Sequence, residues 1–119
     1  MNDIIGWHFQ SETSIPGEVL DILVKGEEPH KAYKTVRDTA VFTNKRIIVI
    51  DSQGITGRKK EIYSLPYKTI AMWSTENAGT IDFTSEVELW TRGAGKIKIT
   101  LGKAIDVRQF EDLLANEIL

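Results

Sequence analysis

The chain has 119 residues, 41% of them hydrophobic and 27% charged, with a net charge of −2 at pH 7. This size and composition exclude a fibrous or disordered chain and predict one globular domain with a genuine core. No cysteine is present, which excludes disulfides, thiolate metal sites and a cysteine nucleophile, and makes the cytoplasm the expected compartment. The segment Met1–Trp7 contains an acid and only a short apolar run, so we expect neither an export signal nor a membrane-spanning segment.

The net charge hides a strong asymmetry along the chain. Residues 1–30 carry one lysine and six carboxylates, a net charge of −5, whereas residues 31–68 carry nine basic and three acidic side chains, a net charge of +6. Within one domain this predicts oppositely charged patches, which attract either a polyanion or the acidic surface of another copy of the chain. Because the total charge is negative, we favour self-association and do not expect nucleic-acid binding.

An N-terminal helical extension is expected within residues 1–30. Ser14 is a suitable N-cap, Pro16 is tolerated in a first helical turn, and Gly26 ends the periodic stretch. The apolar side chains between them share one stripe at helical spacing: Ile15, Val19, Ile22 and Leu23. The pattern therefore predicts a short helix between Ser14 and Gly26.

Residues 31–101 are expected to form a β-barrel. Lys31–Thr43 is rich in β-branched and aromatic residues and predicts one long, bent first strand. Asn44-Lys45 is a suitable two-residue hairpin turn, because asparagine tolerates a left-handed backbone. The continuous apolar run Ile47–Ile50 predicts a strand that is covered on both faces. Two further strands are expected, at Lys59–Leu65 before the break at Pro66, and at Thr69–Thr75.

The next hairpin has the clearest alternation of the chain, after an expected turn at residues 77–79. One face of its first strand carries Phe83, Ser85, Val87 and Leu89, and the other carries Glu86, Glu88 and Trp90. A turn at residues 92–95 leads to Lys96–Leu101, whose isoleucines are expected to point inward and whose lysines point outward. We therefore expect glutamates to face lysines on the outer surface of this hairpin.

The C-terminal segment 104–119 predicts an amphipathic helix. Asp106 is a suitable N-cap, and Gln109 stands at the capping-box position. The apolar stripe of this helix consists of Val107, Phe110, Leu113, Leu114 and Ile118. Successive strands followed by one helix predict a mainly β fold, a partly open antiparallel barrel of about seven strands capped by that helix.

Three segments carry a family resemblance: Val41–Asp51 with its polar turn, Gln53–Gly57, and Ser64–Ile70. With these segments in this order and at these separations, the chain resembles the bacterial pleckstrin-homology-like (PH-like) family. The resemblance extends from about Ile15 to the C-terminus. The resemblance implies the capped barrel as a single domain over residues 1–119 and assembly into closed rings of identical subunits. It implies no particular ligand, since pleckstrin-type folds serve many unrelated tasks.

No catalytic or metal-binding constellation is expected. The two histidines, His8 and His30, lie in no motif, and Glu86 and Glu88 are better explained as a solvated ladder than as an acid/base pair. The glycine pairs lack the strand-to-helix context of a phosphate loop, and Asp51–Gly54 lacks the alternating acids of a calcium loop. We therefore predict no enzyme, cofactor or metal, but an interaction or scaffolding module.

The basic run Arg58-Lys59-Lys60 is the candidate for anion contact. The resemblance suggests a comparison with lipid-binding pleckstrin domains, which hold phosphoinositides with basic residues from the first–second and third–fourth strand connections. With one long first strand, the run falls in the second–third connection, at the opposite end from Lys45 and Arg46, so that signature is not matched. A solvated turn is the favoured interpretation, and an anionic-lipid or membrane-surface module is the alternative function.

Subunit contacts are predicted at Trp90, Ile48 and Ile50. Trp90 projects from the polar face of its strand and is typical of interface cores, although cover by the N-terminal segment through Trp7 explains it equally well. Trp73, by contrast, is expected in the core. The charge asymmetry and the resemblance then predict a cyclic homo-oligomer, with a pentamer favoured.

An unidentified protein partner is expected to bind polar residues of the first two strands. The candidates are Arg37, Asp38, Asn44 and Arg46, because arginine offers a planar, bidentate donor and core packing does not explain the others. The alternative is that Arg37 pairs with a neighbouring acid and that Asn44 serves only the turn geometry.

Overall fold

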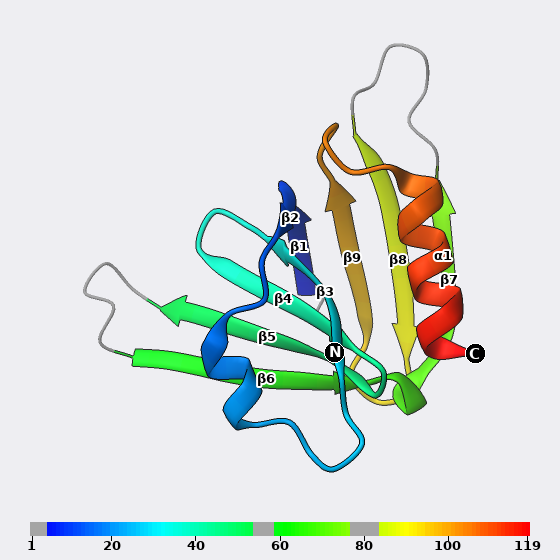
Figure 1. The fold of residues 1–119 in the computed structure, drawn as a ribbon. Coiled ribbons are helices and arrows are strands. Elements are labelled where there is room, and N and C mark those ends of the chain that lie inside the picture. The colour runs from blue at the N-terminus through cyan, green and yellow to red at the C-terminus, as the bar shows by residue number, and fades with distance from the viewer. Residues whose placement is uncertain (1–4, 54–58, 77–83) are drawn as a thin grey trace.

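The computed structural model describes residues 5–53, 59–76 and 84–119, which form two β-sheets and one α-helix (Figure 1). The four-stranded sheet has the order β1-β9-β8-β7, and the five-stranded sheet has the order β2-β3-β4-β5-β6. The strands are β1 Ile5–Phe9, β2 Ser11–Thr13, β3 Pro29–Lys34, β4 Asp38–Thr43, β5 Arg46–Gln53, β6 Lys59–Pro66, β7 Ile70–Glu76, β8 Ser85–Thr91 and β9 Lys96–Leu101. Two 3-10 turns, η1 Gly17–Asp21 and η2 Tyr67–Thr69, and the helix α1 Val107–Ile118 complete the fold. The predicted mainly β architecture with a C-terminal capping helix is confirmed.

The N-terminal segment is a strand that joins both sheets, which the sequence did not predict. β1 runs parallel to β9, with Trp7 opposite Ile99, and β2 pairs antiparallel with β3. The chain passes close to Gly102 at this corner: a Cβ there would lie 3.1 Å from the carbonyl oxygen of Gln10. Glycine at position 102 therefore permits the close approach that closes this side of the barrel.

The predicted N-terminal helix is wrong, and only the 3-10 turn η1 forms between Ser14 and Gly26. Pro16, and not Ser14, precedes the turn, and it provides no side-chain cap. Gly26 then takes a positive φ of 80° and reverses the chain. The apolar side chains that suggested a helix cover the outer face of the five-stranded sheet instead.

The predicted long first strand is also wrong, because it is two strands, β3 and β4, paired antiparallel. The turn between them is built on Thr35, whose hydroxyl accepts hydrogen bonds from the backbone N–H groups of Arg37 at 3.2 Å and Asp38 at 2.8 Å. A threonine hydroxyl stabilises such turns locally. The split and the additional N-terminal strands explain why the described residues form nine strands instead of about seven.

The later elements agree with the prediction. Asn44 and Lys45 connect β4 to β5, although neither takes the left-handed backbone on which the prediction rested. Ser85, Val87 and Leu89 of β8 are buried. On the outer surface of the β8–β9 hairpin, lysines and glutamates pair at 3.1 and 3.5 Å. Asp106 accepts hydrogen bonds from the N–H groups of Arg108 and Gln109 and begins α1. The expected turn at 77–79 and Phe83 lie outside the described residues.

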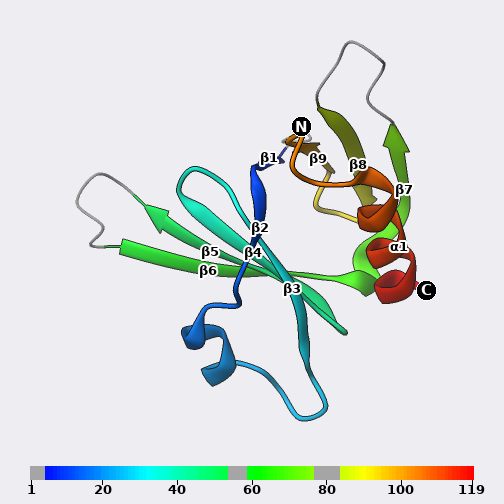
Figure 2. The ribbon, with the colours of Figure 1, turned by 45° about the horizontal axis from the view of Figure 1, so that its top comes forward.

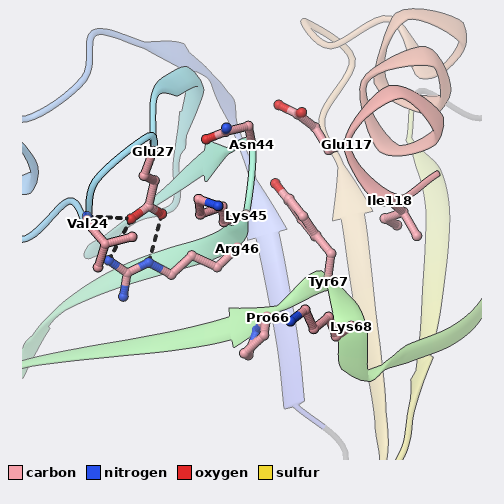
Figure 3. A pocket seen from close by; sticks show the side chains of 10 residues that line it. All are labelled: Val24, Glu27, Asn44, Lys45, Arg46, Pro66, Tyr67, Lys68, Glu117 and Ile118. Carbon is pink, nitrogen blue, oxygen red and sulfur yellow. Dashed lines mark hydrogen bonds and ion pairs between the residues drawn. The ribbon is translucent and has the colours of Figure 1, made fainter.

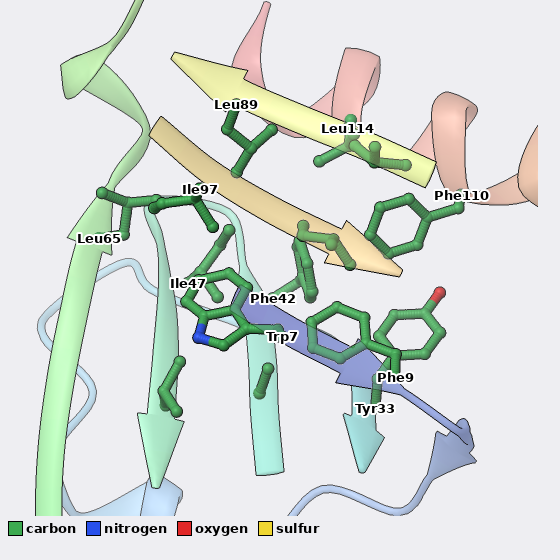
Figure 4. Close-up of a cluster of buried hydrophobic side chains, with 14 of the residues drawn as sticks. Trp7, Phe9, Tyr33, Phe42, Ile47, Leu65, Leu89, Ile97, Phe110 and Leu114 are labelled. Carbon is green, nitrogen blue, oxygen red and sulfur yellow. The ribbon is translucent and has the colours of Figure 1, made fainter. Parts of the chain in front are cut away.

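The main core lies between the two sheets and α1 (Figure 4). Phe110 and Leu114 of α1 are fully buried in it. Four aromatic rings lie at its centre with centroids 5.3 to 6.2 Å apart: Phe9, Tyr33, Phe42 and Phe110. Trp7 packs beside them and donates from Nε1 to the Tyr63 hydroxyl at 3.0 Å. The helix therefore plugs the barrel as predicted.

A second, smaller cluster lies on the outer face of the five-stranded sheet. Val41, Ile48 and Ile50 are buried there against Val19 of η1. This explains the continuous apolar run in β5, since its residues alternate between the main core and the smaller cluster. The cover is the chain's own N-terminal segment.

Candidate binding pocket beside the β4–β5 turn

A pocket of about 700 Å³ lies where four separate segments meet (Figure 3). Its walls come from the loop after η1, the β4–β5 turn, the end of β6 with η2, and the last turn of α1. The lining residues are Val24, Glu27, Asn44, Lys45, Arg46, Pro66, Tyr67, Lys68, Glu117 and Ile118. No short sequence motif contains such a set, because the lining spans residues 24 to 118.

The Glu27–Arg46 ion pair forms one wall of the pocket. Arg46 donates from Nε to Glu27 Oε2 at 2.8 Å and from Nη2 to Oε1 at 3.0 Å, which is a bidentate arrangement. The Thr43 hydroxyl and the Val24 N–H also donate to the Glu27 carboxylate, at 2.7 and 3.0 Å. Because the Arg46 hydrogen bonds favour the charged form, the pKa of Glu27 falls from 4.5 to about 2. The hydrogen bond to Glu27 likewise raises the pKa of Arg46.

Internal hydrogen bonds engage four of the five N–H donors of Arg46. Its Nη2 also donates to the Ile22 carbonyl at 2.9 Å, and its Nη1 donates to the Ser64 hydroxyl at 3.0 Å. The guanidinium therefore ties the segment after η1 to both β5 and β6. Its contacts indicate a structural role that shapes the pocket wall.

Asn44 and Tyr67 fix the shape of the pocket from two further sides. The Asn44 side chain accepts from the Glu28 N–H at 2.7 Å and donates to the Gly26 carbonyl at 3.0 Å. The Tyr67 hydroxyl donates to the Thr43 carbonyl at 2.6 Å, and burial raises the pKa of this tyrosine. These bonds hold the turn and the neighbouring loop in one position.

The charges on the pocket rim are unequally matched. Glu27 is paired with Arg46, and Glu117 is paired with the His30 ring. Lys45 and Lys68 are exposed, and within residues 5–53, 59–76 and 84–119 neither ammonium group has a carboxylate partner. The pocket lining therefore carries two ammonium groups without a carboxylate partner and the Glu117 carboxylate, beside apolar surface from Val24, Pro66 and Ile118.

A family model for the bacterial PH domain matches residues 1–118. The chain belongs to the bacterial PH domain family. It is 48% identical over 84 residues to Uncharacterized protein YjqA of Bacillus subtilis (strain 168), an alignment that covers 71% of this chain and 67% of YjqA. As a bacterial PH domain, it shares a fold that does not by itself specify a ligand.

Two crystal structures of PH domains are similar to this one. A DUF1696 family protein with a pleckstrin-homology domain from Shewanella loihica PV-4 has a TM-score of 0.82 and 38% identity, over 92% of this chain and 97% of that chain. A pleckstrin homology domain from Shewanella amazonensis SB2B has a TM-score of 0.67 and 42% identity, over 86% and 83%. The resemblance read from the sequence is thus confirmed.

The four residues predicted to bind a protein partner do not form one surface in this PH domain. Arg37 and Asp38 lie at the start of β4, whereas Asn44 and Arg46 lie beyond its other end. At about 3.4 Å per residue, β4 separates the two pairs by roughly 20 Å. Arg37 is exposed, while the side chains of Asn44 and Arg46 are committed to internal hydrogen bonds.

The Arg58-Lys59-Lys60 run is predicted to lie between the second and the third strand. That placement is wrong, because the predicted first strand is in fact two strands, β3 and β4. With β3 as the first strand, residues 35–37 form the first–second connection and residues 54–58 follow the third strand. Lys60 therefore lies at the same end of the sheet as the turn of Arg37. Lys60 pairs with Glu18 at 3.4 Å; Arg58 and the Lys59 side chain lie outside what the structure describes.

The predicted subunit contacts are divided between the interior and the surface. Ile48 and Ile50 are covered by the chain itself, at 0% and 5% exposure, which leaves them no surface for a neighbouring subunit in this arrangement. Trp90 is half-buried, with Lys96 Nζ 5.7 Å from its ring centroid, and its role at an interface stays a prediction. Trp73 packs at the edge of the main core and donates to Glu111 at 3.1 Å.

The described residues show neither a cluster of metal ligands nor a helix that could span a membrane. They contain no group of three His, Asp or Glu side chains that could hold a metal ion. None of the helices in the same ranges has the length and apolar character needed to cross a membrane.

Proposed function

We propose that this bacterial PH domain is a non-catalytic cytoplasmic interaction module that assembles into a cyclic homo-oligomer and presents a polar surface to a protein partner. Support for a binding role comes from the fold and from a pocket whose buried carboxylate, Glu27, is fully engaged by four hydrogen bonds. A carboxylate with a pKa of about 2 is a poor general base or acid near neutral pH. The cytoplasmic assignment rests on the absence of cysteine.

Self-assembly is supported chiefly by the separation of unmatched charges. Lys45 and Lys68 lie at the pocket, whereas Asp21 is exposed on η1 and has no ion-pair partner among the described residues. One molecule thus carries a positive surface and a negative surface at different places. Two different, complementary surfaces generate a head-to-tail contact, which closes into a ring when its rotation allows.

Light scattering on the purified domain at micromolar concentration tests the assembly. We expect a multiple of the 13.4 kDa monomer, with a pentamer favoured. Raising the salt concentration should weaken the assembly, because exposed charges are screened. A monomeric mass at low salt contradicts the proposal.

For the protein partner, the β3–β4 turn is the remaining candidate surface. Arg37 is exposed there beside Val36, which is 80% exposed. Affinity capture from a cell extract with wild-type protein and with Arg37→Ala tests this surface, with Arg108→Ala as a control arginine at an exposed position of α1. Light scattering should first show the same oligomer for all three proteins. An unchanged set of captured proteins removes Arg37 from the site.

Anionic-lipid binding is a second candidate, favoured by the common location of Arg37 and Lys60 at one end of the five-stranded sheet. Three acids lie opposite one another in register at that same end, on β4, β5 and β6: Asp38, Asp51 and Glu61. Their negative charge opposes an anionic headgroup, which is why lipid binding ranks second. Sedimentation with anionic vesicles that is lost in Arg58/Lys59/Lys60→Ala would establish it.

A further inference from the structure

The turn η1 exposes a leucine next to an acid that has no ion-pair partner among the described residues. Leu20 is 60% exposed, and Asp21 beside it is exposed, whereas the nearby Glu18 pairs with Lys60 at 3.4 Å. The neighbouring Val19 is 0% exposed and anchors the turn on the outer face of the five-stranded sheet. η1 therefore exposes the apolar side chain of Leu20 next to the carboxylate of Asp21.

The pocket beside the β4–β5 turn has the complementary chemistry. Lys45 and Lys68 at the pocket have no carboxylate partner among the described residues and outnumber its one carboxylate outside the Glu27–Arg46 pair, Glu117. Its lining also includes apolar surface from Val24, Pro66 and Ile118. At about 700 Å³ it is large enough for a leucyl side chain together with part of the turn that carries it. Apolar contact combined with polar groups is the usual anatomy of a specific protein contact.

We infer that η1 of one copy of the chain docks in this pocket of the next copy, with Leu20 between Lys45 and Lys68 and Asp21 against one of the two lysines. This inference rests on the proposed self-assembly and identifies its contact surfaces. In both ribbon views, η1 (blue) lies to the left of the C-terminal end of α1 (red), which borders the pocket (Figures 1 and 2). With Val19 buried beneath η1, Leu20 is exposed and is not among the residues that line the chain's own pocket.

The two kinds of contact have different roles. Burial of Leu20 supplies the non-directional, apolar part of the attraction. The pair between Asp21 and one of the lysines lies at the rim, where a surface ion pair stabilises little. A like charge in the same place opposes association, so this pair contributes mainly to the choice of partner. The Glu27–Arg46 pair contributes indirectly, because it connects the pocket wall to the segment that carries η1.

Charge reversal followed by light scattering tests the contact. Asp21→Lys and the double variant Lys45→Glu/Lys68→Glu should each reduce the mass to 13.4 kDa, whereas the triple variant that combines them should recover the oligomer. Lys34→Glu is the control, because it makes the same type of charge change at an exposed site away from the pocket. Leu20→Asp should also give monomer, whereas Val36→Asp, at another exposed apolar residue, should not.

The outcomes distinguish a failure of the proposed self-assembly from a failure of this particular contact. A monomeric wild type overturns self-assembly and this contact with it. An intact oligomer in both charge-reversed variants overturns the contact and leaves self-assembly standing. Loss of the oligomer in the lysine variant alone, with Asp21→Lys unchanged, shows that the pocket takes a different occupant and also overturns the contact. Far-UV circular dichroism spectra equal to that of the wild type establish that the exposed substitutions leave the fold intact, since loss of the oligomer by itself lowers the melting temperature.

Discussion

The two hydrophobic clusters of this domain differ in size and in what holds their covers in place. Of the described residues, the main cluster buries 17 between both sheets and α1, whereas the outer cluster buries five beneath η1. α1 inserts two fully buried side chains into its cluster, and η1 inserts one, Val19. The outer cover therefore depends more on polar bonds, above all those between Glu27 and Arg46. A cover with few buried apolar contacts belongs to the part of a protein that opens at low free energy.

The difference matters because the surfaces proposed to bind other molecules, η1 and the pocket, depend on the less firmly held outer cover. η1 and the pocket share one short segment, and both are positioned by the Glu27–Arg46 pair. A surface held by a polar network keeps its shape only while every member of that network is satisfied. The comparison predicts that core substitutions unfold the domain, whereas substitutions in the network release the outer cover first.

The largest expected effect is Phe110→Ala in the main core. Removing this fully buried ring, which contacts three other aromatic rings, should lower the free energy of unfolding by about 3–5 kcal/mol. Urea denaturation measures it, with Gln109→Ala at an exposed position of α1 as the control. Leu114→Ala should cost about 2–5 kcal/mol by the same argument. A melting temperature equal to that of the wild type contradicts the assignment of α1 as the plug.

Glu27→Ala should have the next largest effect. It should lower the free energy of unfolding by about 3 kcal/mol, because it leaves the Arg46 guanidinium without its carboxylate. Hydrogen exchange should accelerate at the amides of residues 19–24 and stay unchanged in β8 and β9. Glu28→Ala, at the exposed neighbouring position, should have little effect on either measurement. Uniform acceleration across the domain would show that the outer cover is not a separate unit.

The same pair predicts how stability depends on pH. The folded pKa of Glu27, about 2, lies below its ordinary value of 4.5, so its stabilisation is present above pH 4.5 and is lost as the pH falls through 2. At about 1.4 kcal/mol per pKa unit, wild type should lose about 3 kcal/mol more than Glu27→Gln across this window. Urea midpoints of both proteins between pH 5 and 2 measure the difference, and parallel curves would contradict the role of Glu27.

The smallest effect comes from one methylene group deleted in each cluster. Ile97→Val in the main core should cost about 1 kcal/mol, because the closely packed interior cannot relax around the missing group. Ile48→Val should cost less, since the η1 segment can move inward over it. Thermal denaturation of the two variants side by side provides the comparison. An equal or larger loss for Ile48→Val would mean that the outer cover is as rigid as the core.

Local signals explain what was predictable from the sequence. The Asp106 cap and the apolar stripe determine α1 within one segment, and the alternation of β8 and β9 needs only nearest neighbours. The Asn44-Lys45 turn is also local, but the reason predicted for it is wrong: neither residue has a positive φ, and the Thr43 hydroxyl accepts hydrogen bonds from the Lys45 and Arg46 N–H groups at 3.0 Å. Such elements form from contacts close in sequence, and their patterns can be recognised without knowledge of the rest of the fold.

The remaining features depend on contacts between distant segments. The spacing of Val19 and Ile22 suits an α-helix as well as it suits the short turn that forms. The turn is favoured by packing of these side chains on the apolar outer face of the five-stranded sheet, which the local sequence does not show. Trp7 and Phe9 alternate as in a strand, yet their partner β9 is far along the chain. In the pocket, Asn44 and Arg46 could be singled out from the sequence but Glu27 could not, because a single acid within a loop has no pattern of its own.

The parallel pairing of β1 with β9 also bears on how quickly the domain folds. Ile5 lies opposite Ile97, so this ladder brings together residues 92 positions apart in sequence. The entropy of closing a loop that long is lost before the ladder contributes any hydrogen bonds, and contacts of high sequence separation slow folding. The antiparallel meanders β3–β6 and β7–β9 join sequence neighbours and can assemble first. Docking of the N-terminal strand is therefore expected to be the late, rate-limiting step that closes the barrel.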